Sequence, residues 1–189
     1  MPSIDPSDAI LRTTLELLAE RGVHGLTVEG VAARSGVAKT TIYRRWRSKQ
    51  DLALAALVDI ADRQTQRPRD LGDTRSELLA FVMRLVRVLS SSLVGRVVHG
   101  LVSELDSDPE LARTFREQVL ARRTAELDHI LERGVQRGEV RADARAGIAM
   151  DLLLGPIYYR LLLSGAPLTR QFAEEVVDSF LAAATKSPE

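Results

Sequence analysis

The chain has 189 residues, of which 45% are hydrophobic and 28% are charged, a composition typical of a folded soluble protein rather than of a disordered one. The absence of cysteine excludes disulfide bonds and thiolate metal sites. The 26 basic and 26 acidic side chains balance, so only a local concentration of charge can indicate a nucleic-acid partner. No basic segment followed by an apolar core stands near residue 1, and we therefore expect a cytoplasmic protein without a signal peptide.

Four helices are predicted in the N-terminal part of the chain. Pro6 suits the first position of a helix, and Thr27 and Ser48 suit the N-cap, where a hydroxyl accepts a backbone hydrogen bond. Gly22 and Gly36 are typical of helix ends, because glycine adopts the left-handed conformation at little cost. The predicted helices span residues 6–22, 28–35, 39–46 and about 48–67.

Helical periodicity continues to the C-terminus, and no segment alternates as a strand would. Residues 67–73, RPRDLGD, are the best candidate for a linker. Thr74, in a capping box with Glu77, and Asp143 are predicted N-caps, and Gly165 is a predicted break. The remaining helices are predicted at about residues 74–89, 95–105, 109–138, 144–163 and 169–184. The sequence thus predicts an all-α fold of nine helices.

The most apolar stretch, residues 148–163, contains Asp151, Pro156 and Arg160 and is shorter than a bilayer span. It predicts a buried helix and no membrane partner. Because it is apolar on nearly every side, one small helical body can hardly cover it. We therefore also predict a homodimer built on residues 144–163 and 169–184.

Residues 28–46 have the arrangement of a helix-turn-helix, in which a tight turn at Gly36 joins two short helices. The residues predicted to pack inward are Val31, Ala32, Val37, Ile42 and Trp46. The residues predicted on the opposite face of the second helix are Lys39, Thr40, Tyr43, Arg44 and Arg47. A helix fits the major groove of DNA, where Arg or Lys reads guanine and a Thr methyl contacts thymine.

Positive charge is concentrated in the same place. Residues 34–49 hold six basic side chains and no acid, which would attract phosphates whatever the DNA sequence. The alternative is a solvated basic face on a small bundle, the usual meaning of a run of charge. The position favours DNA binding, because the helix is too short to stand alone and directly follows a glycine turn.

The stretch LTVEGVAARSGVAKTTIYRRWRSKQDLALAAL, residues 26–57, resembles the DNA-binding domain of the TetR family of bacterial transcriptional regulators. The matching residues are Thr27, Val31, Ala32, Gly36, Val37, Thr41, Ile42, Tyr43, Trp46, Ser48, Lys49 and Leu52. Two positions depart from the family pattern: Thr40 stands where many relatives have glycine, and Ala38 replaces a frequent serine cap. Both departures could alter which bases are read.

The resemblance implies roles for individual residues. The residues that would face base edges are Lys39, Thr40 and Arg44. The residues that would hold phosphates are Thr27, Thr41, Tyr43 and Lys49. Trp46 would be structural, whereas Arg45 and Arg47 would be solvated, paired with acids or in contact with DNA.

Two other classes of function fit the sequence less well. The Glu126-x-x-His129 spacing occurs in carboxylate metal sites, but these need a second such pair, which His24 and His99 do not form. Asp151 is either a helix-edge or arginine-paired residue or a polar anchor in a ligand pocket. We therefore predict no enzyme activity, no metal and no cofactor.

A DNA-compacting protein would be basic throughout, whereas residues 101–143 carry ten acids and seven arginines.

The resemblance implies residues 1–50 as the DNA-binding domain, 51–67 as a connecting helix and 68–189 as the effector-binding and dimerisation domain. The implied partners are a palindromic double-stranded DNA operator, a small-molecule effector and a second copy of the chain. The expected function is that of a repressor, which the effector releases from its operator by changing the spacing of the two DNA-reading ends.

Large adaptable side chains in the C-terminal part are predicted to line an apolar effector pocket. These residues are Phe81, His99, Phe115, Met150, Tyr158 and Tyr159. Each could instead be packed in the core, which is the more common place for an apolar side chain. Pro156 favours the pocket, since proline bends a helix and opens space beside the two tyrosines. The predicted effector is mainly hydrophobic and neutral or weakly charged, rather than a sugar phosphate or a metal ion.

Overall fold

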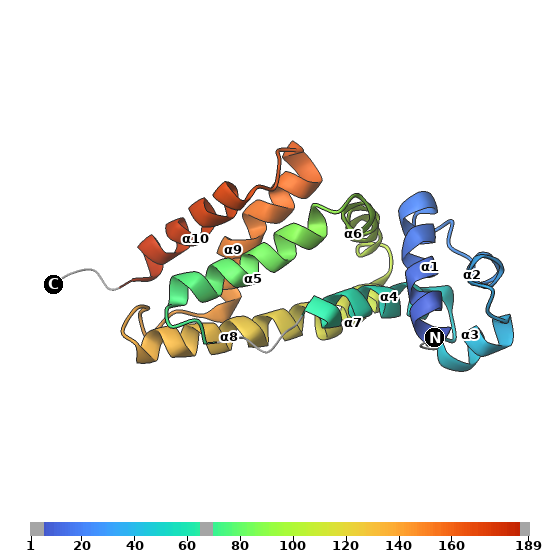
Figure 1. Ribbon diagram of the computed structural model, residues 1–189, viewed down its shortest axis with the longest axis horizontal. Helices are drawn as coiled ribbons and strands as arrows, with labels where there is room; N and C mark the ends of the chain where they lie inside the picture. The colour runs from blue at the N-terminus through green and yellow to red at the C-terminus, as the bar shows by residue number, and fades with distance from the viewer. Residues whose placement is uncertain (1–5, 65–69, 186–189) are drawn as a thin grey trace, which may run out of the picture. The chain divides into compact units, whose positions relative to one another are not determined.

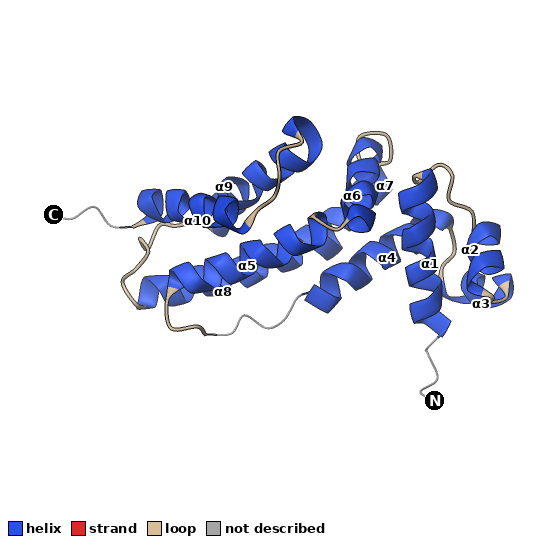
Figure 2. Cartoon of the chain, turned by 45° about the horizontal axis from the view of Figure 1, so that its top comes forward, coloured by secondary structure: helices blue, strands red, loops and turns tan. Residues whose placement is uncertain are grey.

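The structure, a computed structural model, describes residues 6–64 and 70–185, and in these ranges the chain is helical with no strand (Figures 1 and 2). The first helices are α1 (Pro6–Arg21), α2 (Val28–Ser35), α3 (Lys39–Arg45), α4 (Lys49–Gln64), α5 (Thr74–Leu89) and α6 (Ser92–Glu104). The later helices are α7 (Pro109–Phe115), the π-helix η1 (Arg116–Leu120), α8 (Ala121–Gln136), α9 (Ala146–Tyr159), the π-helix η2 (Arg160–Ser164) and α10 (Arg170–Ala184). Since α7, η1 and α8 are continuous, as are α9 and η2, the described residues form nine helical runs. The predicted all-α fold of nine helices is confirmed.

The chain divides into two compact units. One, which we call the head unit, comprises Met1–Arg63 and Ser92–Val119, and the other, the body unit, comprises Gln64–Ser91 and Leu120–Glu189. The helices α6 and α7 therefore belong to the head unit, although they follow residue 68 in the chain. The functional boundaries expected at residues 50 and 67 stay predictions, because compactness does not show where DNA or an effector binds.

In the head unit, α1 contacts α2 and α6, and α2 contacts α3. The core at these contacts is aliphatic, and its fully buried members include Ile10, Leu26, Val31, Ile42 and Leu52. Burying each such side chain contributes about 1.5–3 kcal/mol. Ala32, Val37 and Trp46 pack against this core while partly exposed. The predicted inward face of the helix-turn-helix is thus confirmed.

Local caps fix the bounds of the short helices. The Thr27 hydroxyl accepts a hydrogen bond of 3.1 Å from the Gly30 amide, and Gly36 ends α2 with φ of 71°. A side chain with a Cβ is strained at that φ, which explains glycine in the turn. Ser48 accepts a hydrogen bond of 3.0 Å from the Asp51 amide at the start of α4. Ala38 supplies no side-chain cap to α3. The predicted end of the fourth helix, near residue 67, lies outside the described residues.

The body unit is a four-helix bundle in which α10 packs on α5 and α9, and α8 packs on the same two helices (Figure 1). Its fully buried side chains include Leu78, Leu127, Leu153, Ile157 and Val177. The predicted break at Gly165 is confirmed by its φ of 66°, and the Thr169 hydroxyl caps α10 through the Phe172 amide.

Three predicted local details are wrong. The N-cap of α5 is Asp73, whose carboxylate accepts a hydrogen bond from the Ser76 amide, and Thr74 is the first helical residue. The N-cap of α9 is Arg145, while Asp143 pairs with Arg141 at 3.1 Å. At α5 the adjacent Asp73 took the capping position, whereas α9 begins without a side-chain cap. The helix α6 begins at Ser92, so the break after α5 is shorter than predicted.

Glu77 forms a buried ion-pair network instead of a capping box. Its side chain is 1% exposed and accepts hydrogen bonds from Arg133, at 3.0 Å to Nε, and from Arg137, at 2.8 Å to Nη2. Burial raises the pKa of Glu77, but the hydrogen bonds from the two guanidinium groups outweigh it and hold that pKa below its ordinary value. The network therefore joins the start of α5 to the end of α8 and stabilises the bundle at neutral pH.

Glu77→Gln is expected to reduce the free energy of unfolding by about 3 kcal/mol at neutral pH, because it leaves the partly buried Arg133 without its carboxylate and leaves Arg137 with Asp70, at 2.6 Å, in place of two carboxylates. Because the pKa is lowered in the folded state, this stabilisation is complete above the ordinary value of 4.5 and disappears as the pH falls below it. Urea unfolding at neutral and acidic pH measures both effects. Glu132→Gln, at a 67% exposed side chain, should change stability by less than about 0.5 kcal/mol; equal losses from the two variants would contradict the account.

The helix formed by α9 and η2 is not buried as predicted. Four of its large apolar side chains are exposed: Ile148 by 58%, Leu152 by 49%, Tyr159 by 59% and Leu163 by 76%. Continuous from Ala146 to Ser164, the helix has 19 residues and is long and apolar enough to cross a membrane by length and composition alone. The prediction that this apolar segment is too short to span a bilayer is therefore wrong. Its exposed face needs another explanation.

Candidate nucleic-acid interface

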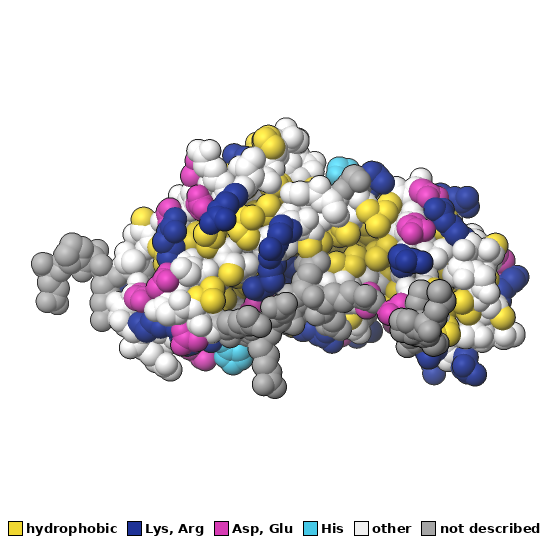
Figure 3. Space-filling model, in the orientation of Figure 1, with side chains coloured by type: hydrophobic (Ala, Val, Ile, Leu, Met, Phe, Trp, Pro, Cys, Tyr) yellow, Lys and Arg dark blue, Asp and Glu magenta, His cyan; other side chains and the backbone are white. Residues whose placement is uncertain are grey.

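The exposed face of α3 carries the residues that the sequence predicts at DNA. Ile42 is fully buried and anchors the helix in the head core, which turns Thr40, Tyr43 and Arg44 outward. Tyr43 is 48% exposed, an unusual position for a large aromatic side chain with no partner to cover it. Lys and Arg side chains project at the end of the head unit where Figure 1 shows α2 and α3 (Figure 3). The exposed face of the helix is thus basic.

Lys39 and Arg34, both in the basic stretch between 34 and 49, are paired with acids elsewhere in the head unit. Lys39 Nζ lies 3.2 Å from a carboxylate oxygen of Glu29. Arg34 lies 2.7 Å from Glu20 and 3.4 Å from Glu16, and the hydrogen bond that it donates to the Glu20 carboxylate raises the pKa of Arg34. Sequence reasoning missed these acids because they precede the basic stretch and are brought to it only by the packing of α1 on α2 and of α2 on α3.

Arg44 and Arg47 differ from that pair. Both are exposed, and neither makes an ion pair or hydrogen bond with a residue that the structure describes. Arg44 lies in the last turn of α3, and Arg47 follows the helix. An exposed guanidinium without a protein partner can donate two parallel hydrogen bonds to the edge of guanine or to a phosphate. Arg44 is therefore the best placed of the predicted base-reading residues.

Two predicted phosphate ligands also have structural roles. Lys49 Nζ donates hydrogen bonds to the carbonyl oxygens of His24, at 3.2 Å, and Val23, at 3.5 Å. These bonds hold the loop between α1 and α2 against the start of α4. The Thr27 hydroxyl accepts the capping hydrogen bond of α2 and keeps its own hydrogen available for a phosphate oxygen. Thr41 is half-buried beside the exposed Tyr43.

Lys49→Ala is expected to weaken binding to all DNA sequences alike and to reduce the slope of log affinity against log salt by about one unit. Since it also removes the two carbonyl contacts, it should lower the free energy of unfolding by about 1 kcal/mol. Fluorescence anisotropy over a salt series and urea unfolding measure the two effects. An unchanged salt slope would remove Lys49 from the interface and leave it a purely structural residue.

The predicted effector residues are divided between the two units. Phe81, Met150 and Tyr158 lie in the body unit, where Phe81 is buried and the other two are half-buried. His99 and Phe115 lie in the head unit, and His99 is exposed. Tyr159 is exposed on α9. Phe81, Met150 and Tyr158, all in the body unit, therefore remain candidates for one effector site.

The other polar residues singled out in the sequence are either paired with a charged neighbour or exposed. The Glu126 carboxylate pairs with Arg84, and His129 lies 3.4 Å from Glu132. Asp151 is exposed on α9. No group of three His, Asp or Glu side chains in the described ranges is arranged to hold a metal ion.

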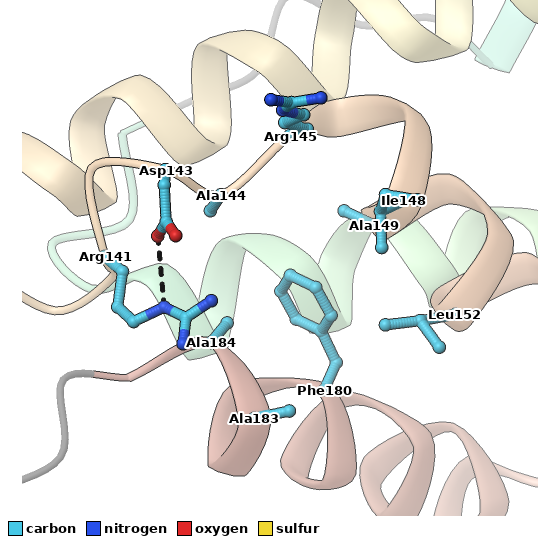
Figure 4. A pocket seen from close by; sticks show the side chains of 10 residues that line it. All are labelled: Arg141, Asp143, Ala144, Arg145, Ile148, Ala149, Leu152, Phe180, Ala183 and Ala184. Atoms are coloured by element: carbon cyan, nitrogen blue, oxygen red, sulfur yellow. Dashed lines mark ion pairs between the residues drawn. The ribbon is translucent and has the colours of Figure 1, made fainter.

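A pocket of about 450 Å³ opens between the start of α9 and the end of α10 (Figure 4). Ile148 and Leu152 from α9 and Phe180 from α10 form its apolar side, and the Arg141–Asp143 ion pair stands at its rim. None of the six predicted effector residues lines it. The pocket lies on the exposed apolar face of α9 that carries Ile148 and Leu152.

The comparison with known families matches both parts of the chain. Residues 10–56 match the family described as bacterial regulatory proteins, tetR family. Residues 68–180 match the family described as tetracyclin repressor-like, C-terminal domain. The first match covers the helix-turn-helix, and the second covers most of the remaining chain.

Known relatives agree over nearly the full length. The HTH-type transcriptional regulator YdeS of Bacillus subtilis (strain 168) is 31% identical over 169 residues, which are 89% of this chain and 84% of the relative. The DNA-binding transcriptional repressor TetR of Mycobacteroides abscessus is 31% identical over 176 residues, 93% of this chain and 91% of the relative. Both relatives are named as regulators of transcription and not as enzymes.

The crystal structure of the TetR family transcription regulator SCO0332 superimposes with a TM-score of 0.76 at 31% identity. The superposition covers 97% of this chain and 100% of that one. A second, FadR from Bacillus subtilis in complex with stearoyl-CoA, superimposes with a TM-score of 0.78 over 93% of this chain and 97% of that one, at 21% identity, and shows the shared fold. With its helix-turn-helix, its all-helical body and relatives that match along its length, the chain belongs to the TetR family of DNA-binding bacterial transcriptional regulators.

Proposed function

We propose that the protein is a cytoplasmic repressor that binds a palindromic operator as a homodimer and is released by a hydrophobic small molecule. The observation that carries the proposal is Arg44 on α3, which is exposed and has no ion pair or hydrogen bond with a residue that the structure describes, on a helix whose Ile42 is part of the head core. The relative from Mycobacteroides abscessus, which is 31% identical over 93% of this chain and is named a repressor, supports the direction of regulation.

DNA recognition is assigned to the head. Residues 1–50 form the DNA-binding domain, with α3 in the major groove so that Lys39, Thr40 and Arg44 meet base edges. The residues assigned to phosphates are Thr27, Thr41, Tyr43 and Lys49. Before it can contact a base, Lys39 must leave Glu29, and the ion pair is weak enough for this, since both side chains are more than half exposed. The binding energy therefore depends more on Arg44 than on Lys39.

Dimerisation is assigned to α9 and α10 in the domain of residues 68–189. Ile148, Leu152, Tyr159 and Leu163 recur on α9–η2 at helical spacing and expose an apolar stripe. A stripe of this kind in a water-soluble regulator is covered by a partner, and a two-fold interface lets the same patch cover itself. The charged Asp151 in the same helix disfavours the alternative, a bilayer, because a carboxylate at membrane depth is costly.

Effector release is assigned to the body, connected to the head through residues 51–67. Two heads bind tightly only when their spacing matches successive major grooves, so an effector that favours another spacing weakens both half-sites together. Phe81, Met150 and Tyr158 supply the apolar and aromatic surface for a hydrophobic ligand. The effector thus acts by binding one arrangement of the body better than the other.

A reporter assay tests the proposal. The operator selected by the purified protein is placed between a promoter and a reporter gene, in a bacterial host with and without the full-length chain. We expect reporter output to fall when the protein is present and to recover when a library of hydrophobic small molecules is added. Increased output on expression would identify an activator, and an Arg44→Ala variant that still represses would overturn the assignment of α3.

A further inference from the structure

The pocket between the start of α9 and the end of α10 has a large apolar side (Figure 4). Ile148 and Leu152 extend from α9 toward the ring of Phe180 on α10. The first two side chains are 58% and 49% exposed, and the other apolar residues at the pocket are alanines, whose short side chains leave it open. Its volume of about 450 Å³ is in the range of small-molecule sites. The pocket therefore offers apolar surface that a small ligand can cover.

The charged side chains at the rim of this pocket do not balance. Arg141 Nε lies 3.1 Å from Asp143 Oδ1, and these two side chains are 49% and 74% exposed. Arg145 is also exposed, and its side chain makes no ion pair or hydrogen bond with a residue in the described ranges. Two guanidinium groups thus stand with one carboxylate, so the residues that line the pocket carry one net positive charge.

Backbone hydrogen bonds hold Arg141 at the pocket. Its amide donates to the Ala184 carbonyl oxygen at 2.9 Å, which ties the loop between α8 and α9 to the end of α10. From this loop the guanidinium extends toward the side on which Phe180 lies (Figure 4). A guanidinium has five N–H donors, and Nε is the atom that pairs with Asp143. The terminal nitrogens of Arg141 make no hydrogen bond to any residue that the structure describes, so they are available to a ligand.

We propose that this pocket binds a small amphiphilic monoanion, a carboxylate in the simplest case. The carboxylate accepts hydrogen bonds from the terminal nitrogens of Arg141, and the apolar part of the ligand covers Ile148, Leu152 and Phe180. The site is separate from the effector residues assigned above, none of which lines it. It does not depend on the proposed repressor function, since the body unit of one chain supplies all ten lining residues.

A monoanion fits the charge of the rim better than a neutral molecule or a dianion. A planar guanidinium donates two parallel hydrogen bonds to a carboxylate, whereas a neutral head gains no charge-assisted bond. A dianion such as a phosphate ester would exceed the net charge of the lining residues and would be repelled by the Asp143 carboxylate. Because Arg141 is half exposed, we expect the anion to bind roughly fivefold tighter than its neutral analogue.

NMR titration of the full-length protein with labelled Ile and Leu methyl groups tests the site. Octanoate is compared with octanol, and phenylbutyrate with phenylbutanol, at neutral pH and low ionic strength. We expect each carboxylate to bind roughly fivefold tighter than its alcohol. The methyl signals of Ile148 and Leu152 should shift, whereas those of Leu71, which is 47% exposed but outside the pocket, should stay in place.

Substitutions at the rim test the head of the ligand. In Arg141→Gln the preference for the carboxylate should shrink to about twofold or less, while the alcohols bind as before. Asp143→Asn removes the competing carboxylate and should tighten octanoate binding by about two- to threefold without changing octanol binding. Arg170→Gln is the matched control, since Arg170 is an exposed arginine at the other end of α10, paired with Glu174 at 2.8 Å. It should keep the full preference.

A structural disturbance of the loop would weaken carboxylate and alcohol binding alike, so the comparison within each pair of probes separates it from loss of the cation. Equal affinities for carboxylates and alcohols in the wild type, absence of shifts at Ile148 and Leu152, or a preference that survives Arg141→Gln would each overturn the inference. Weaker octanoate binding by Asp143→Asn would overturn it as well.

Filling the pocket tests its apolar part. Ala183 lines the pocket and is exposed, so Ala183→Trp should be tolerated by the fold and should block both carboxylates and alcohols. Ala182→Trp is the control, because Ala182 is exposed on the same helix but does not line the pocket. It should bind all four probes as the wild type does. Octanoate binding that survives Ala183→Trp would place the ligand elsewhere and overturn the inference.

Ile148 and Leu152 also belong to the apolar stripe assigned to the partner subunit, and Leu163→Glu separates the two roles. Leu163 does not line the pocket, so this variant should keep the preference for octanoate even as a monomer. Octanoate binding by a Leu163→Glu variant that is still dimeric would sustain the pocket and contradict the assigned interface. Loss of binding in a monomeric Leu163→Glu would show that a second copy completes the site, and would overturn the inference of a site within one chain.

Discussion

Arg44→Ala is expected to reduce affinity for the selected operator roughly five- to 150-fold while hardly changing binding to unrelated DNA, which corresponds to ~1–3 kcal/mol for a bidentate contact with guanine. The physical reason is that Arg44 is exposed on α3 and has no ion pair or hydrogen bond with a residue in the described part of the chain, so its donors are available to a base. Competition anisotropy with operator and scrambled duplexes measures the ratio of the two affinities.

Arg113→Ala is the control for this variant. Arg113 lies on α7 and pairs with Glu117 at 3.1 Å, so its removal takes away one positive charge without touching α3. It should leave the ratio of operator to scrambled affinity unchanged. An unchanged ratio in Arg44→Ala as well would show that this residue does not read sequence.

Leu163→Glu is expected to convert the dimer to a monomer and to weaken operator binding by at least about 100-fold. A dimer binds both half-sites of the palindrome together, whereas each monomer binds one half-site independently. Leu163 is 76% exposed, so a charge there is tolerated by the isolated chain and becomes costly only when a partner covers it. Leu152→Glu, at a 49% exposed side chain, should act in the same way. Sedimentation velocity at micromolar concentration and operator anisotropy measure the two effects.

Leu71→Glu is the matched control, because Leu71 is 47% exposed but lies before α5, away from the apolar stripe of α9–η2. It should remain a dimer with normal operator affinity. Substitution of Leu161, which is only partly exposed, would mix folding effects with assembly. A monomeric wild-type protein, or dimeric Leu152→Glu and Leu163→Glu variants, would contradict the interface on α9 and α10.

The bounds of the helices could be predicted where one residue determines the local backbone conformation or caps the helix end. Thr27 and Gly36 bracket α2 because a hydroxyl cap and a left-handed glycine have few substitutes. At the start of α5 two residues that can cap a helix are adjacent in the chain, and Asp73 rather than the predicted Thr74 is the cap. Glu77 then turned inward to Arg133 and Arg137, more than fifty residues away in the chain, which no local pattern can show.

The residue types of the DNA-reading face could be predicted from helical spacing, because one face of α3 must cover Ile42 and the other must be exposed. Whether each basic side chain is paired or available to DNA could not be predicted, since this depends on groups from other parts of the fold. Glu29 reaches Lys39, and the carbonyl oxygens of Val23 and His24 reach Lys49.

Selection of bound DNA from a random pool tests the central claim most directly, namely that α3 of a dimeric TetR-family protein reads a palindromic sequence. The purified full-length chain and its Arg44→Ala variant are taken through the same rounds of selection and sequencing. We expect the wild type to enrich one inverted repeat, with half-sites about one helical turn or a multiple of it apart, and the variant to lose preference at a guanine within each half-site. Failure of the wild type to enrich any sequence, or enrichment of an identical repeat by Arg44→Ala, would contradict the account.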